Sequence, residues 1–151
     1  MPNRRLVLGA IVLVALAQAA FFIGYQQPDW DRAWTDQGGY QMLARGIIRT
    51  GEFTRYADAP EFVAEALRTP GYPLFVAAVY TLFGDSHMAV AVVQAAVFAA
   101  LCLLAYLIGL EVATARVALT AAAATALYPM FPYFGALVLT ELWTTFVLTA
   151  G

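Results

Sequence analysis

The chain has 151 residues, of which 62% are hydrophobic and only 12% charged. Soluble domains are nearer to half apolar and a quarter charged, so this composition excludes an ordinary soluble domain and indicates a membrane protein. Eight arginines and no lysine against ten acidic residues give a formal charge of -2, which excludes nucleic-acid binding through phosphate neutralisation. The chain has a single cysteine, Cys102, which excludes a cysteine-rich zinc site. It has a single histidine, His87, with only Asp85 near it in the sequence, so we assign no metal site.

The first predicted element is an apolar helix over residues 6–23, interrupted only by Gln18 and preceded by Arg4 and Arg5. Basic residues before a first span predict that the N-terminus lies in the cytoplasm. Small residues at 15–19 also fit a signal-peptide cleavage site, but the apolar run continues past them to the length of a span. We therefore favour an uncleaved span, with a signal peptide as the alternative.

Residues 24–87 form a predicted external loop that holds most of the charged residues. Thr35 or Asp36 can cap an amphipathic helix that ends at Gly51. The apolar face of that helix carries Tyr40, Leu43, Ala44, Ile47 and Ile48. A shorter helix is expected over 59–67, and the apolar stretch 72–83 is about 18 Å long as a helix, too short to cross a bilayer core of about 30 Å. We expect 72–83 to be interfacial or re-entrant.

Three further spans are predicted over residues 88–110, 117–131 and 134–151. The first has no charged residue, and its Gln94 is expected to face protein instead of lipid. The alanine-rich stretch 117–131 loses helical regularity at Pro129 and Pro132. Because the last run is still apolar at Gly151, we expect residues 1–151 to be a single membrane domain from the N-terminal part of a longer chain. The predicted fold class is all-α integral membrane, with about four transmembrane helices and amphipathic juxtamembrane helices in the external loop.

The order of the spans decides which acidic residues share a membrane face. With the N-terminus inside, the loop 24–87 is outside, the turn at 111–116 is inside, and residues 128–135 emerge outside again. Asp36 and Glu141 then lie toward the same face. If residues 72–83 crossed the membrane, these two acids would lie toward opposite faces.

Two acidic residues are candidates for catalysis. Glu141 is the only acid inside an apolar run, where an ionisable group costs roughly 2.5 kcal/mol or more, so a functional role is the default interpretation. Its alternative is a carboxyl that reaches the interface or is neutral and hydrogen-bonded. Asp36 opens the amphipathic helix at the membrane surface, where a carboxylate can act as general base toward a hydroxyl. Its alternative is a helix cap.

Candidate binding residues lie close to these acids in the predicted topology. Arg68 is the best cation for a phosphate, because a guanidinium donates two hydrogen bonds to phosphate oxygens and stays charged. Its alternatives are a lipid headgroup or a pair with Glu65. Tyr40, Tyr72 and Tyr133 are candidate substrate-binding residues, although the aromatic belt of membrane interfaces explains most tyrosines and tryptophans near the ends of spans.

Several short motifs follow one another along the chain: TDQGGYQMLARG at 35–46, GEF at 51–53, RTPGYP at 68–73 running to LFG at 82–84, VQ at 93–94, and YP at 128–129 leading to LTE at 139–141. Their order resembles the N-terminal part of GT-C type membrane glycosyltransferases, the group that contains protein O-mannosyltransferases and the lipid A aminoarabinose transferase. The resemblance covers essentially all 151 residues. It departs from the family at 111–116, where Glu111 and only Arg116 replace a turn that is usually rich in arginine or lysine.

The resemblance implies a juxtamembrane helix after the RTP element and a meeting of Asp36 and Glu141 at the external face. It further implies sugar transfer from a polyprenyl-phosphate-linked donor to a hydroxyl acceptor on a glycan, lipid or protein, in the bacterial inner (plasma) membrane. Asp36 would then be the base, Arg68 or another cation would receive the leaving phosphate, and Glu141 would orient the acceptor or Asp36, or help to hold a cation. A divalent metal is possible, but no feature of the sequence requires it. Family enzymes are several times longer, so we expect this chain alone to be inactive; the alternative function is a non-catalytic membrane scaffold or transporter fragment.

Overall fold

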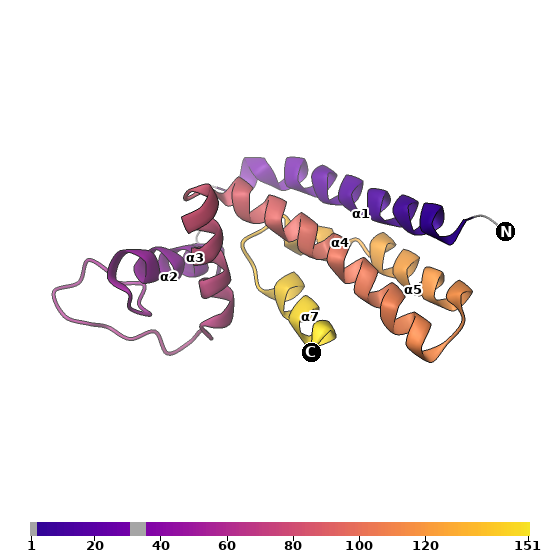
Figure 1. Ribbon diagram of the computed structural model, residues 1–151. Helices are drawn as coiled ribbons and strands as arrows, with labels where there is room; N and C mark the ends of the chain where they lie inside the picture. The colour runs from indigo at the N-terminus through magenta and orange to yellow at the C-terminus, as the bar shows by residue number, and fades with distance from the viewer. Residues whose placement is uncertain (1–2, 31–35) are drawn as a thin grey trace.

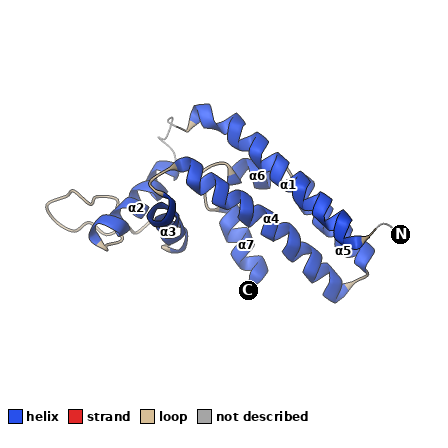
Figure 2. Cartoon of the chain, turned by 45° about the horizontal axis from the view of Figure 1, so that its top comes forward, coloured by secondary structure: helices blue, strands red, loops and turns tan. Residues whose placement is uncertain are grey.

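The computed structural model describes residues 3–30 and 36–151, and in these ranges the chain is helical with no strand (Figure 2). The all-helical class predicted from the sequence is confirmed. The elements in chain order are α1 (Arg4–Gln26), the short 3-10 turn η1 (Gln27–Asp29), α2 (Asp36–Thr50), α3 (Gly71–Phe83), α4 (His87–Val112), α5 (Ala115–Leu127), α6 (Met130–Gly135) and α7 (Glu141–Ala150).

Helices α1, α4 and α5 form a bundle, and α2 and α3 pack against each other beyond one end of it (Figure 1). The N-terminus and the turn between α4 and α5 lie at the opposite end. Helix α3 runs across the direction of the bundle, so it is not a parallel member of it. Helices α2 and α3, which belong to the predicted loop 24–87, therefore lie at the end of the bundle where α1 ends and α4 begins.

Two helices are long and apolar enough to cross a membrane by length and composition, namely α1 with 23 residues and α4 with 26. They correspond to the predicted spans 6–23 and 88–110. The other apolar helices are shorter, with 13 residues each in α3 and α5. Helix α5 ends at Leu127, just before Pro129, as the proline positions predicted.

The prediction of one continuous helix over 134–151 is wrong. The chain instead forms the six-residue α6, a bend at 136–140, and the ten-residue α7. Pro129 precedes α6 and Pro132 lies in its first turn, where a missing backbone N–H costs nothing. Helix α7 begins at Glu141, and a carboxylate is favourable in the first turn of a helix because it faces the positive end of the helix dipole.

The loop between α2 and α3 contains no helix at 59–67, so that prediction is also wrong. Helix α2 ends where expected, at Gly51, whose φ of 74° is readily adopted only by glycine. Beyond it, the hydroxyl of Thr54 donates to the carbonyl oxygen of Val63 at 2.6 Å, and the N–H of Glu65 donates to the carbonyl of Phe53 at 3.2 Å. These bonds use backbone groups that a helix over 59–67 would need for itself.

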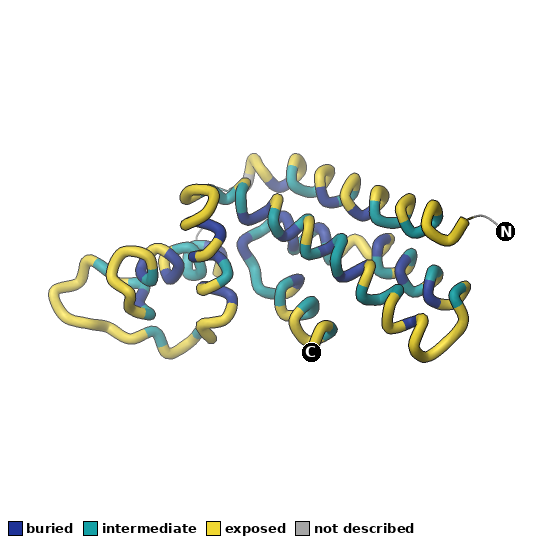
Figure 3. The backbone as a smooth tube through the Cα atoms, in the orientation of Figure 1, coloured by how far each residue is buried: buried dark blue, intermediate teal, exposed yellow. Residues whose placement is uncertain are grey.

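Small residues allow the bundle helices to approach closely. Helix α5 buries Ala118, Ala122 and Ala126, which recur every four residues and so form one stripe. A Cβ atom added to Gly109 of α4 would lie 2.7 Å from the Cα atom of Ala118. Such small-residue contacts are typical of helices that pack in membranes. By contrast, most of α1 is exposed or half-buried along its length (Figure 3).

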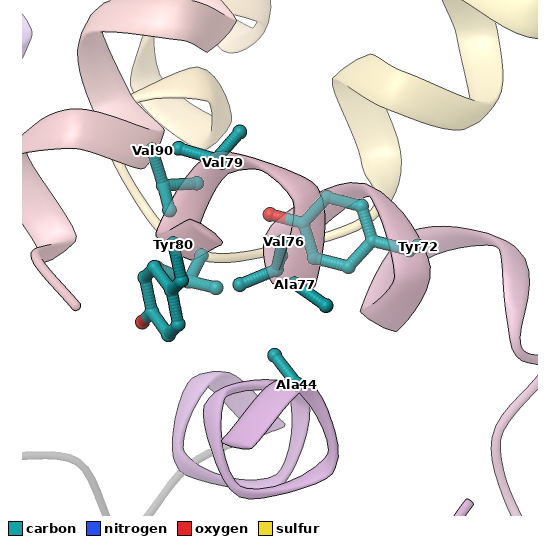
Figure 4. Close-up of a cluster of buried hydrophobic side chains, with 8 residues drawn as sticks. Ala44, Tyr72, Val76, Ala77, Val79, Tyr80 and Val90 are labelled. Atoms are coloured by element: carbon teal, nitrogen blue, oxygen red, sulfur yellow. The ribbon is translucent and has the colours of Figure 1, made fainter. Parts of the chain in front are cut away.

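A cluster of buried side chains joins α2 and α3 to the bundle (Figure 4). It contains Ala44, Tyr72, Val76, Ala77, Val79, Tyr80, Val90 and Val138. Because these residues come from α2, α3, α4 and the bend before α7, the cluster holds α2 and α3 against the end of α4. The site described next lies on the margin of this cluster.

Candidate functional site

An ion pair joins the start of α2 to the end of the loop. Nη2 of Arg68 lies 2.6 Å from Oδ1 of Asp36. The side chain of Asp36 is 72% exposed, whereas that of Arg68 is only 14% exposed. Gly39 leaves the room for this approach, because a Cβ there would lie 2.7 Å from Cζ of Arg68. The result is an accessible carboxylate held by a largely buried guanidinium.

The buried carboxylate of Glu65 lies next to the Arg68 side of this pair. Its side chain is 1% exposed, pairs with Arg55, and lies 3.9 Å from Nη1 of Arg68. Its other carboxylate oxygen accepts the N–H of Leu67 at 2.7 Å. Burial alone would raise the pKa of Glu65, but the Leu67 N–H and the two arginines outweigh it and lower the pKa. Arg68 therefore makes both the pair with Glu65 and the pair with Asp36.

Tyr40 stands beside this pair. The guanidinium carbon of Arg68 lies 5.2 Å from the centre of the Tyr40 ring, and the Tyr40 and Tyr72 rings meet edge to face with centroids 5.0 Å apart. Burial raises the pKa of Tyr40; Arg68 opposes this, while the charges of Asp36 and Glu141 add to it. Burial also raises the pKa of Tyr72 well above its usual value, with a further contribution from Glu141. Both predicted catalytic acids thus act electrostatically on the same tyrosine.

Glu141 is the first residue of α7, and its side chain is exposed, so the carboxylate is not buried among the described helices. Glu141 borders a pocket of about 170 Å³ lined by aromatic residues of α6 and its surroundings. Those aromatic residues are Tyr128, Phe131 and Phe134. The carboxylate therefore lies at the edge of an apolar hollow, and its charge also acts on Tyr40 and Tyr72.

The bend before α7 is fixed by buried glutamines. Gln94 is fully buried, and its amide nitrogen donates to the carbonyls of Gly135 at 3.0 Å and Leu137 at 2.7 Å. Its amide oxygen accepts the hydroxyl of Tyr72 at 3.2 Å. The prediction that Gln94 faces protein is confirmed. From α2, the side chain of Gln37 accepts the N–H of Val138 at 3.0 Å.

Two aromatic side chains, Trp30 and His87, also contact the backbone of the bend before α7. The indole N–H of Trp30 donates to the carbonyl of Ala136 at 3.1 Å, and Nε2 of His87 lies 3.3 Å from the same oxygen. The two rings stack with centroids 4.0 Å apart. His87 therefore has a place in this packing, and among the described residues no group of three His, Cys, Asp or Glu side chains could hold a metal ion.

Four of the six predicted site residues are joined by direct contacts, namely Asp36, Tyr40, Arg68 and Tyr72. Glu141 is linked to them through the effect of its charge on Tyr40 and Tyr72. Tyr133 lies elsewhere: its ring packs edge to face on Phe22 of α1, with centroids 5.9 Å apart. Thr35, the alternative cap for α2, lies outside the described residues. Glu65 and Gln37 were not predicted as part of the site, since neither an acid in a polar loop nor a glutamine in an amphipathic helix stands out in a sequence.

Comparison of the chain with protein-family models, with curated proteins and with solved structures gives no match.

Proposed function

We propose that this protein is a membrane glycosyltransferase that moves a sugar from a polyprenyl-phosphate-linked donor to a hydroxyl acceptor. The observation that supports it most is the group at the start of α2, where the exposed carboxylate of Asp36 is paired with Arg68 at 2.6 Å. Tyr40 lies against Arg68, and the charges of Asp36, Arg68 and Glu141 all act on Tyr40. A base, a cation for phosphate and a second acid are the groups that such a transfer needs.

In the proposed reaction, the acceptor hydroxyl oxygen attacks the anomeric carbon of the donor sugar. Its proton passes to the carboxylate of Asp36 as the bond between that carbon and the phosphate oxygen breaks. The polyprenyl phosphate leaves with the bonding electrons, and the anomeric configuration inverts. Arg68 has further N–H groups beyond the one that contacts Asp36, and these would bind the leaving phosphate. Glu141 would orient the acceptor.

The proposed topology has the N-terminus in the cytoplasm, following Arg4 and Arg5, and the site at the external face of a bacterial inner membrane. Helices α1 and α4 make the first two crossings. Helices α5 and α6 together make the third, and α7 begins the fourth. In this topology α2 and α3 lie in the external interface, with the apolar face of α2 toward the lipid and toward α3.

The test is transfer activity in membranes that carry the protein expressed from its natural gene, assayed with a panel of radiolabelled polyprenyl-phosphate sugars. Asp36→Asn is expected to lower the rate by a factor of about 100 or more, because it removes the base. The matched control is Asp58→Asn, which alters another exposed loop carboxylate that pairs with an arginine, Arg49. Near-normal transfer by Asp36→Asn, or equal losses in both variants, would contradict the assignment. Wild-type membranes inactive with every donor would favour the scaffold or transporter alternative.

A further inference from the structure

A second pocket, lined in part by charged side chains, lies at the other end of α2, away from Asp36. It has a volume of about 280 Å³ and lies between the C-terminal half of α2 and the end of α3. Its lining residues are Arg45, Ile48, Arg49, Tyr80, Thr81 and Asp85. None of these residues takes part in the site described above, so the pocket needs a separate explanation.

Tyr80 gives the clearest indication that the pocket has an occupant. Its side chain belongs to a residue only 4% exposed, yet its hydroxyl has no hydrogen-bond partner among the described residues. The ring packs beside Val90 and Ala44 with its oxygen directed away from Val76 and Ala77 (Figure 4). Burial, with a contribution from Asp85 and against Arg45, raises the pKa of Tyr80 to about 12. The hydroxyl is therefore a neutral donor that lacks an acceptor, which is rare for a buried polar group.

The charged groups around the pocket alternate in sign. Arg45 makes two contacts to Asp85, at 2.6 and 3.0 Å, and Arg49 makes two to Asp58, at 3.2 and 2.5 Å. The four side chains are between 45% and 80% exposed. Exposed ion pairs contribute little to stability, so these arginines can exchange a carboxylate for a phosphate at low cost. The displaced carboxylates would then be available for a cationic group.

Apolar side chains continue from the pocket. Ile48 on α2 is 47% exposed, and Leu82 and Phe83 at the end of α3 are 74% and 64% exposed. A ligand that matches all of these features has an anionic and a cationic group close together and an apolar tail. We infer that the pocket binds the headgroup of a zwitterionic phospholipid of the phosphatidylethanolamine class. The phosphate accepts hydrogen bonds from Tyr80 and Arg45, the ammonium contacts Asp85 or Asp58, and the acyl chains lie along Ile48 and Leu82.

The first experiment is native mass spectrometry of the purified protein in detergent, titrated with phosphatidylethanolamine. We expect one tightly bound lipid in the wild type. Tyr80→Phe removes only the unpartnered hydroxyl and should weaken binding about fivefold, the effect of one lost hydrogen bond. The matched control Tyr106→Phe, on α4 and outside the pocket, should bind as the wild type does. Unchanged affinity in Tyr80→Phe would overturn the inference.

The same titration decides whether the ligand must be zwitterionic and must be a lipid. Asp85→Asn should weaken binding of phosphatidylethanolamine and leave phosphatidylglycerol, which lacks the ammonium, no weaker than before. Equal affinity of the wild type for both lipids would overturn the zwitterionic assignment. Binding of inorganic phosphate or phosphoethanolamine as tight as that of the lipid would overturn the lipid assignment. No sugar donor is present, so these results are independent of the proposed transferase activity.

A melting curve without added lipid tests whether Tyr80→Phe weakens lipid binding merely by destabilising the protein. Since no described residue accepts a hydrogen bond from the Tyr80 hydroxyl, Tyr80→Phe should melt no lower than the wild type in lipid-free detergent. A clearly lower melting temperature would show that the hydroxyl already has a partner within the protein, and would remove the basis of the inference.

Discussion

Replacing Gln94 with leucine should destabilise the protein even though leucine is the more apolar side chain. In a helix long enough to cross a membrane, an apolar residue is ordinarily preferred to an amide. Gln94, however, is fully buried and makes three hydrogen bonds, two to the bend before α7 and one to Tyr72. The substitution leaves the shape of the site roughly filled while it removes every one of these bonds.

The loss of stability depends on whether each group that bonds to Gln94 keeps another hydrogen bond after the substitution. The carbonyl of Leu137 also accepts the N–H of Leu139 at 2.9 Å, so it keeps a partner. The carbonyl of Gly135 and the hydroxyl of Tyr72 lose the bonds that Gln94 makes to them. A buried neutral group left unsatisfied costs about 1–3 kcal/mol, so two such groups predict a loss of about 3 kcal/mol.

The assay is unfolding in mixed micelles of mild detergent and sodium dodecyl sulfate, followed by circular dichroism. Gln18→Leu on α1 is the matched control, because it is the same change in the other long apolar helix. Gln18 makes one bond, to the carbonyl of Ala126 at 2.6 Å, so its loss should cost about 1 kcal/mol or less. Equal destabilisation by the two substitutions, or a more stable Gln94→Leu, would refute the reasoning.

Two further predictions concern the junction of α2 with the loop. Gly46→Ala should lower the melting temperature by several degrees and the free energy of unfolding by about 2 kcal/mol, because the added Cβ would overlap the backbone carbonyl oxygen of Thr54. The control Gly71→Ala should not, because a Cβ added there meets no neighbouring atom within 4 Å. Protection of residues 53–67 from hydrogen exchange should be constant above pH 4.5, the usual pKa of a glutamate, and should fall below it, because the pKa of Glu65 is lower in the folded protein. Glu65→Gln should flatten that pH dependence, and an unchanged profile in this variant would assign it to another group.

Local patterns in the sequence were sufficient to predict much of the fold. The uninterrupted apolar runs predict α1 and α4, the helical spacing of apolar residues predicts α2, and Gly51 marks the end of that helix correctly. These features depend on residues close together in the chain. The same is true of the end of α5 before Pro129.

The two wrong helix predictions fall where side chains from outside the predicted helix form hydrogen bonds with its backbone. Residues 134–151 read as one apolar run, but Gln94 and Gln37 bind the backbone at 135–138 and the chain bends there. Residues 59–67 favour a helix by composition, but Thr54 binds the carbonyl of Val63. In the site, Asp36 and Arg68 could be predicted from residue type and position, whereas the role of Glu65 depends on how the loop folds back.

The bend before α7 also determines the order in which the protein can assemble. Its hydrogen bonds join Gln37 to Val138 and Trp30 to Ala136, across separations of 101 and 106 residues. Contacts between such distant residues form late, after local helices are in place. During synthesis from the N-terminus, the residues whose side chains bond to the bend are translated before the bend itself. Glu141 is therefore set in position by helices that are already packed, and a packing error in those helices would displace it without any change in α7.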